Sequence, residues 1–135
     1  MNHTLRFEKV HQYDSSLVGI EVPTVLIAGR REVTVFPKLD TGAANCVFER
    51  RYAELLELDV EAGRLQRFQT AAGSFATFEH EVTIRTLGVT FSAVVYFAQE
   101  FAFQKNVLGR TGWLDRVRLG IVDYEQRLYL SPYDE

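Results

Sequence analysis

The clearest pattern in the chain is an alternation of apolar and other positions with a period of two, which is typical of a β-strand with one buried face. It covers Val89 to Phe97, where every odd-numbered residue is apolar. The strand-like run Glu81–Thr86 precedes this segment and is separated from it by Leu87-Gly88, which suits a tight turn. The two runs are therefore predicted to form a β-hairpin.

Two more hairpins are predicted from paired strand-like runs. The first joins Pro23–Ala28 to Glu32–Phe36 through Gly29-Arg30-Arg31, a short polar turn. The second joins Leu119–Val122 to Arg127–Leu130 near the C-terminus, across four mostly polar residues. The runs contain mainly aliphatic and β-branched residues, which favour strands over helices.

Helical periodicity is scarce in this chain. Apolar residues recur at helical spacing between Glu49 and Leu58, which predicts one short helix, and Thr111–Val117 is predicted to form a second, shorter one. Because strand patterns dominate, the chain is predicted to be all-β with one or two short helices. A length of 135 residues suffices for one domain with its own core, so residues 1–135 are interpreted as a single domain.

The charge balance excludes one class of function. The chain has 15 Lys and Arg against 18 Asp and Glu, for a net charge of −3. A protein that binds nucleic acid usually has a basic field, so we expect no nucleic-acid partner. The three histidines lack the spacing of metal ligands, and we expect neither a metal nor another cofactor.

Cysteine usage and hydropathy bear on the compartment. Cys46 is the only cysteine, so no internal disulfide can form, which favours a reducing environment. We interpret this residue as a small buried hydrophobe. No apolar run is long enough to span a bilayer, and the first residues lack the apolar core of a signal peptide. We therefore expect a cytoplasmic protein with no membrane partner.

The strongest candidate for chemistry is Asp40-Thr41-Gly42-Ala43, which directly follows a predicted strand. A surface turn would account for the Asp, the Thr and the Gly. It would not account for the apolar residues on both sides of the motif, which are Val33, Val35, Leu39, Val47 and Phe48. These residues predict that a charged loop is held rigidly on a β scaffold.

With this motif the chain resembles the retropepsin-like (retroviral-type) aspartic proteases. In that family an apolar strand runs into Asp-Thr/Ser-Gly-Ala, and the Asp is catalytic. Asn106–Arg110 resembles the second family signature, two large aliphatic residues followed by Gly-Arg. Gln69–Phe75 has the small-residue tip of a hairpin where the family has its flap. The order and spacing of the three elements match over roughly Val33 to Leu130.

The resemblance implies a closed β-barrel of the acid protease type, a single lobe that forms a homodimer, and Asp40, Thr41 and Gly42 as catalytic residues. Peptide hydrolysis needs a base for the water and an acid for the carbonyl oxygen. Two carboxylates about 3 Å apart share one proton and supply both roles, as is established for aspartic proteases. This chain has one Asp-Thr-Gly, so a two-fold homodimer is the way to pair the carboxylates.

The resemblance also implies residues for substrate and structure. Those expected to bind substrate are Lys38, Ala43 and Ala44 beside the catalytic acid, and Ala72, Gly73 and Ser74 at the flap tip. Gly109 and Arg110 are expected to have structural roles. Phe101 and Phe103, in a loop-like stretch, are further candidates to line a peptide groove.

Three features depart from the retroviral pattern. Ala44 replaces an acidic residue that usually pairs with Arg110, and Asp115 or a C-terminal acid is a candidate substitute. Lys38 replaces an aliphatic residue; we hypothesise that it favours the ionised pair and biases cleavage toward acidic or polar side chains. The C-terminal hairpin and tail are too long and polar for interleaved termini, which favours a differently organised dimer interface.

Two functions of different classes remain open. The first is a homodimeric aspartic endopeptidase acting on a peptide or protein substrate. The second is a non-proteolytic retropepsin-like module for peptide binding or assembly, because a fold does not determine a function. Asp40→Asn would abolish the activity of the first and leave the affinity of the second intact.

Overall fold

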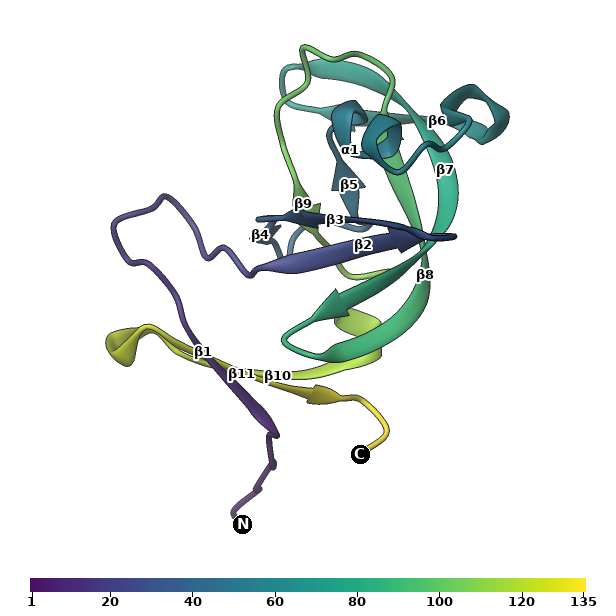
Figure 1. Cartoon of the computed structure of the whole chain (residues 1–135). Helices are drawn as coiled ribbons and strands as arrows, with labels where there is room; N and C mark the ends of the chain where they lie inside the picture. The colour runs from purple at the N-terminus through teal and green to yellow at the C-terminus, as the bar shows by residue number, and fades with distance from the viewer.

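The computed structural model describes all 135 residues, and strands dominate it (Figure 1). The strands are β1 (Lys9–Gln12), β2 (Thr24–Ala28), β3 (Arg31–Val35), β4 (Lys38–Leu39), β5 (Val47–Phe48), β6 (Arg64–Thr70), β7 (Gly73–Thr86), β8 (Val89–Ala98), β9 (Val107–Leu108), β10 (Val117–Val122) and β11 (Arg127–Pro132). The one α-helix is α1 (Arg50–Leu55), and single 3-10 turns cover Val60–Ala62, Leu114–Arg116 and Asp123–Glu125. The prediction of an all-β chain is confirmed.

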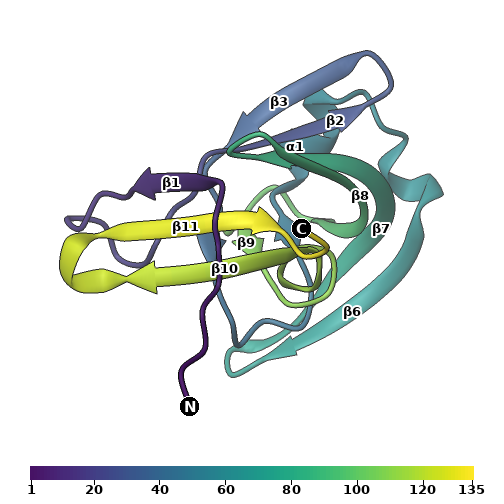
Figure 2. The same cartoon turned by 90° about the horizontal axis from the view of Figure 1, so that it is seen from below.

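The larger of two sheets has eight strands in the order β3-β2-β7-β8-β5-β9-β4, with β6 added beside β7. It is curled into a half-barrel by the long, bent hairpin β7–β8 (Figures 1 and 2). Leu87 and Gly88 join these two strands with φ of 50° and 84°, so both adopt the left-handed conformation that a two-residue hairpin turn requires. This predicted hairpin is confirmed.

The other two predicted hairpins are also present. β2 pairs with β3, and its turn is one residue shorter than predicted, because Arg31 already pairs with Ala28. β10 pairs with β11 across the residues that were predicted to be a turn, and Gln126 has a φ of 54° there. Antiparallel hairpins with polar turns are local structures, which is why the sequence pattern locates them well.

One core serves both sheets. It is a cluster of 22 buried residues drawn mainly from the large sheet, α1, Trp113, β10 and β11. The Trp113 ring is completely buried, and its Nε1–H donates to the hydroxyl of Thr86 (3.1 Å), which also contacts the hydroxyl of Thr24 (3.1 Å). No buried side-chain nitrogen or oxygen lacks a hydrogen-bond partner, so the polar groups in this core are compensated.

The helical predictions need correction. The predicted helix Glu49–Leu58 ends at Leu55, because Glu57 turns into the left-handed region with a φ of 57°. The predicted helix Thr111–Val117 is wrong, since only a 3-10 turn forms within it. Gly112 has a φ of 104° there, and Trp113 leaves the helical region to place its ring in the core. No helix in the structure has the length and apolar character needed to cross a bilayer.

The smaller sheet has three strands in the order β1-β11-β10, all from one chain. β11 is the central strand: Leu130 is in register with Lys9 of β1 on one side and with Leu119 of β10 on the other. Figure 2 shows the segment before β1 crossing the outer face of β11 and β10. Phe7 packs there against Tyr129, with ring centroids 5.8 Å apart and the rings tilted by 39°.

Tyr13, at the end of β1, ties the smaller sheet together. Its backbone N–H donates to the carbonyl of Gln126 (3.0 Å), and its hydroxyl donates to Oδ1 of Asp123. This hydrogen bond, with burial of the ring, raises the pKa of Tyr13 to about 12. The residue thus fixes the chain after β1 onto the tip of the β10–β11 hairpin.

The wild type is expected to lose stability at alkaline pH through Tyr13, and Tyr13→Phe should remove this loss. The pKa of Tyr13 is about 12 in the folded chain and about 10 in the unfolded chain. Because the folded value is the higher one, the stabilising contribution is complete below about pH 10 and is lost as the pH rises through about 12. The difference in unfolding free energy between the two proteins, measured in urea, should be constant below about pH 10 and shrink above it. A difference that stays constant through pH 12 would contradict the role of this hydrogen bond.

Candidate active site

The loop that contains Asp40 is anchored by β9. β4 leads into the loop and pairs in parallel with β9, so that Leu39 is in register with Leu108. The N–H of Lys38 donates to the carbonyl of Asn106 (2.9 Å), and the N–H of Asp40 donates to the carbonyl of Leu108 (3.0 Å). Leu108 is completely buried, so the loop starts from a rigid point of the core.

The loop itself is a tight turn that presents the Asp40 carboxylate outward. The N–H of Gly42 donates to Asp40 Oδ1 (2.9 Å), and the N–H of Ala43 donates to the Asp40 carbonyl (3.1 Å). Asp40, Thr41 and Gly42 are all exposed. Asp40 forms no ion pair, and the Thr41 hydroxyl has no hydrogen-bond partner within the chain. One carboxylate oxygen and one hydroxyl are therefore free for groups from outside.

The two family-like motifs contact each other through Gly109. The N–H of Arg110 donates to the carbonyl of Ala43 (2.9 Å), just beyond this glycine. A Cβ on Gly109 would lie 2.2 Å from the carbonyl oxygen of Asn45 and 2.8 Å from that of Ala43. Both are backbone atoms, so a larger residue would require the main chain itself to shift. Only glycine fits here, which gives the Gly-Arg signature a steric reason.

Cys46 lies beneath this contact. Its side chain is completely buried, and its sulfur accepts from the N–H of Gly109 (3.4 Å). Burial raises the pKa of the thiol to about 11, so the thiol stays protonated near neutral pH. The interpretation of Cys46 as a small buried hydrophobe is confirmed.

Arg110 has no acidic partner within the chain. Asp115 accepts instead from the N–H of Gly112 (3.0 Å) and lies 3.8 Å from Nε of Arg116, so the suggested Arg110–Asp115 pair is wrong. No C-terminal acid forms an ion pair with Arg110 either. The exposed guanidinium lines a pocket of about 510 Å³, which we call the Arg110 pocket; its other lining residues are Thr41, Ala44, Thr111, Leu114 and Asp115.

The predicted flap is the β6–β7 hairpin. Thr70 pairs with Gly73, and Ala71-Ala72 form the tip. The Thr70 hydroxyl donates to the carbonyl of Gly73 (2.9 Å) and accepts from the N–H of Ala72 (3.2 Å), which makes the tip a closed turn. Gly73 has a φ of 127°, in the region that favours glycine.

A pocket of about 390 Å³, which we call the flap pocket, lies between the flap and the Asp40 loop. The predicted site residues Asp40, Gly42, Ala43 and Ala44 line it. The predicted flap residues Ala72, Gly73 and Ser74 do not line it, because the tip extends past the pocket and is exposed. The flap side is lined instead by Phe68, Gln69, Thr70 and Phe75, and the opposite side includes Asn45, Val47, Phe103, Lys105 and Val107.

An aromatic cluster forms the apolar wall of the flap pocket. Phe75 stacks on Phe103 with centroids 4.6 Å apart, and Phe68 meets the edge of Tyr96 at 5.1 Å. Phe103, one of two aromatic candidates from the loop before β9, thus lines the pocket. The other, Phe101, lies away from it under the guanidinium of Arg50 (5.5 Å). That Phe68 and Phe75 line the pocket could be predicted from the sequence only if the register between the strands β6 and β7 were known.

Lys38 lies beside Asp40, although not in the flap pocket. Both residues, with Lys105, line an adjoining pocket of about 440 Å³ that also contains Glu21 and Glu49. The Lys38 stem packs on Gly19, where an added Cβ would lie 3.3 Å from Lys38 Cδ. Lys105, which lines both pockets beside Asp40, was missed in the sequence because a single exposed Lys in a loop gives no pattern.

The arrangement limits what one chain can do. A single exposed carboxylate beside an apolar pocket can serve as a base or as an acid, but not as both at once. No group of three or more His, Cys, Asp or Glu side chains is placed to hold a metal ion. The site therefore needs a second acid from outside the chain to hydrolyse a peptide bond by water activation.

Comparison with solved structures shows the fold. A retropepsin-like aspartic protease from Rickettsia conorii superposes with a TM-score of 0.65 at 15% identity, covering 91% of this chain and 97% of that one. EIAV protease, in complex with the inhibitor HBY-793, superposes with a TM-score of 0.55 at 20% identity, covering 72% and 86%. No protein-family model and no curated protein matches the sequence. The chain has a retropepsin-like fold, as predicted; identities of this size do not extend to the reaction.

Proposed function

We propose that this chain is an aspartic endopeptidase that hydrolyses peptide bonds as a homodimer, with one Asp40 from each copy. The observation that supports this most is the position of Asp40: its exposed carboxylate stands beside a flap-covered apolar pocket on a retropepsin-like fold. It has no counter-ion in the chain, and the Gly42 N–H orients one of its oxygens. Such a group is free to meet an identical group on a two-fold axis.

The chemistry follows from sharing one proton between the two carboxylates. The ionised carboxylate takes a proton from water while the protonated one gives its proton to the carbonyl oxygen of the substrate. One hydroxyl of the resulting tetrahedral adduct returns its proton to the ionised carboxylate as the C–N bond breaks, and the other carboxyl gives its proton to the leaving amine. One water is consumed, an acid and an amine are formed, and the pair returns to its starting state.

The neighbouring groups have supporting roles in this proposal. The Thr41 hydroxyl, which has no partner within the chain, bonds to the loop of the second copy and holds the two carboxylates close. The flap strands β6 and β7 close over an extended peptide and add backbone hydrogen bonds. The aromatic wall of Phe68, Phe75 and Phe103 favours a large apolar side chain beside the cut bond.

Digestion of a peptide library near pH 5, run with sedimentation of the same sample, tests the proposal. The wild type should cut peptides and form dimers, and Asp40→Asn should form dimers without cutting. Undiminished peptide affinity in Asp40→Asn together with no cutting by the wild type would support the non-proteolytic module instead. We also propose peptides or proteins of the cytosol as substrates, since a chain with one cysteine needs no oxidising compartment.

Lys38→Leu is expected to change both pH dependence and cleavage preference. A cation beside the paired carboxylates favours their ionised state, so its removal should move the acid limb of the kcat/KM profile to higher pH. Cleavage beside acidic side chains should fall, because the positive charge that attracts them is lost. Arg30→Leu, in the exposed turn between β2 and β3 and outside the pockets that Asp40 lines, is the matched control and should change neither. An unchanged profile with unchanged cleavage sites would discard the role of Lys38.

A further inference from the structure

We propose that two copies associate through a projecting arm, which consists of β1, the loop of residues 14–19 and the tip of the β10–β11 hairpin (residues 121–126). The inference rests on the proposed function in one respect: the second copy is needed to supply the second Asp40. It commits to another copy of this chain as the partner of this surface. The arm lies on one side of the molecule, beyond β4 (Figure 1).

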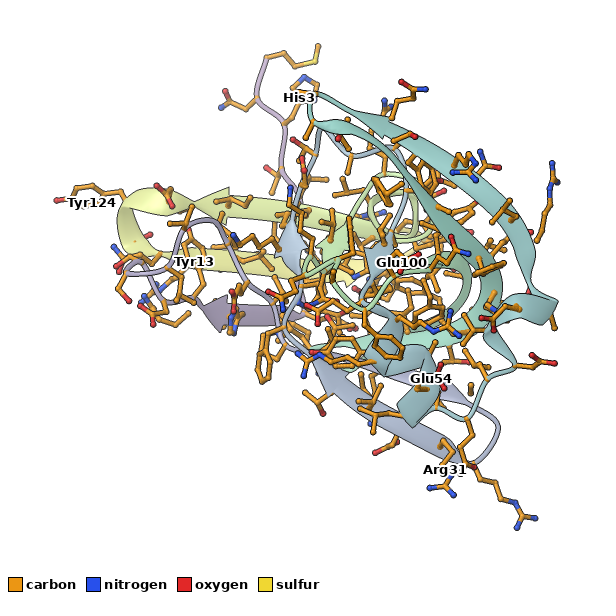
Figure 3. The ribbon with its side chains drawn as sticks, turned by 90° about the horizontal axis from the view of Figure 1, so that it is seen from above. His3, Tyr13, Arg31, Glu54, Glu100 and Tyr124 are labelled. Carbon is orange, nitrogen blue, oxygen red and sulfur yellow. The ribbon has the colours of Figure 1, made fainter.

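The arm is one rigid unit. β1 pairs along β11, and the Tyr13 N–H and hydroxyl bond to Gln126 and Asp123 at the hairpin tip. The Gln12 amide donates to the carbonyl of Glu125 (2.8 Å). The loop that starts at Asp14 therefore moves together with the hairpin tip, and Figure 3 shows Tyr13 and Tyr124 at this same end of the molecule.

The arm is attached directly beside the candidate active site. The N–H of Leu39 donates to the carbonyl of Ile20 (2.8 Å). Ile20 is the first residue after the loop of the arm, and Leu39 directly precedes Asp40. Gly19 and Asp40 line the same pocket. A second copy that brings its Asp40 to this one must therefore come close to the base of the arm.

Exposed apolar side chains gather on the arm. Val18 is 84% exposed and Tyr124 is 95% exposed; Val10, Leu17, Ile121 and Val122 are also exposed. Single exposed hydrophobes are ordinary, but a cluster on one projection is a feature of association surfaces. Figure 3 shows Tyr124 pointing away from its own chain, so nothing in that chain covers its ring.

The strand pairing restricts how the partner docks. β11 is hydrogen-bonded on both edges within its own chain, so a strand of the second copy cannot insert beside it without breaking β1 or β10 away. In this sheet, a strand of the second copy could therefore pair only at the outer edge of β1 or of β10. Docking through the side chains of the arm is an isologous contact, in which each arm lies on the other copy.

The Arg110 pocket offers a complementary surface for the partner's arm. It adjoins the Asp40 loop through Thr41, and its guanidinium has no acid within the chain. Of the three carboxylates near the end of the arm, those of Asp14 and Asp123 form no ion pair, whereas Glu125 lies 3.8 Å from Nη1 of Arg127. Asp115, which also lines this pocket, accepts from Gly112 and lies 3.8 Å from Nε of Arg116, so Arg110 is the charged lining residue without an ion-pair partner. Apolar contact with Leu114 and charge pairing with Arg110 thus both favour the arm as the occupant.

Sedimentation over a concentration series tests the arm without reference to activity. Val18→Asp and Tyr124→Asp place a charge on the apolar contact and are expected to weaken self-association at least tenfold relative to the wild type. Both side chains are exposed, so the fold should be retained, which circular dichroism would verify. Leu55→Asp, at an exposed apolar position on α1, is the matched control and should associate as the wild type does. Arm variants that associate like the wild type, or a wild type that stays monomeric throughout, would overturn the inference.

A tandem fusion separates the arm from the chemistry. Two copies joined by a flexible linker meet at an effective concentration of the order of millimolar, so the fusion of an arm variant should recover cleavage that the separate variant lost. The same fusion of Asp40→Asn should stay inactive. If the arm variants fail to associate and their fusion also fails to cut, while the wild type cuts, the arm acts through something other than association and the inference is wrong. If the wild type dimerises through the arm but cuts nothing, the proposed protease function fails and the interface remains.

Discussion

Asp40→Asn will abolish peptide cleavage, with a fall in kcat of at least about 10³-fold. An amide cannot take a proton from water, and in a dimer of the variant both copies have amides, so no proton is shared. The Gly42 N–H can still donate to the amide oxygen, so the loop should keep its shape and the protein its stability. Initial rates on a peptide selected from the library, with urea unfolding of both proteins, measure the two effects.

Mixing the two proteins makes the test more specific. If each site uses one Asp40 from each copy, a mixed dimer is inactive, and a ninefold excess of Asp40→Asn should reduce the rate per wild-type chain to about a tenth after exchange. Asp134→Asn, in the exposed C-terminal tail, is the matched control. Mixing it with the wild type should leave the cleavage rate per chain unchanged. A rate that stays constant on mixing would mean that one chain acts alone, which contradicts a shared site.

Gly109→Ala will destabilise the protein by on the order of 3 kcal/mol and also impair the site. The added Cβ would lie 2.2 Å from the Asn45 carbonyl oxygen, so the Asp40 loop and the segment after β9 must separate. That separation breaks the Arg110–Ala43 hydrogen bond and shifts Asp40. A displacement of about 1 Å in a catalytic group can cost about 10²-fold in rate. Urea unfolding and kcat on the folded fraction measure the two losses.

Gly29→Ala is the control for this substitution. Gly29 sits in the turn between β2 and β3 with a φ of 58°, and a Cβ there would meet nothing within 4 Å. It should lose only about 1 kcal/mol, from left-handed strain, with no change in kcat. Equal effects of the two substitutions would show that the contact at Gly109 has no special role.

The sequence is a good guide where the structure is local. The alternation in β8 and the turn at Leu87-Gly88 need only neighbouring residues to be interpreted, and both are confirmed. The Asp40 loop is also found from its own motif and the apolar residues around it. The helix predicted after Arg110 fails for a reason that is not local, since burial of the Trp113 ring overrides the helical preference.

The parts that the sequence does not reveal depend on pairing across long distances. β1 is a short, mostly polar segment, and it becomes a strand only because β11 meets it more than a hundred residues later. The inner face of the flap pocket depends on the register of β6 with β7 and on where the loop with Phe103 and Lys105 settles. That Arg110 has no ion-pair partner likewise becomes clear only when Asp115 is seen to contact Gly112 and Arg116.

Because β1, β11 and β10 all belong to one polypeptide, each copy can complete its fold before it meets another. Maturation of the proposed enzyme is then two successive events, a first-order folding step and a second-order encounter. While the chain is scarce, active sites would accumulate with roughly the square of its amount. If the proposed activity holds, a cell could thus make the chain in an inert form and obtain activity simply by making more of it.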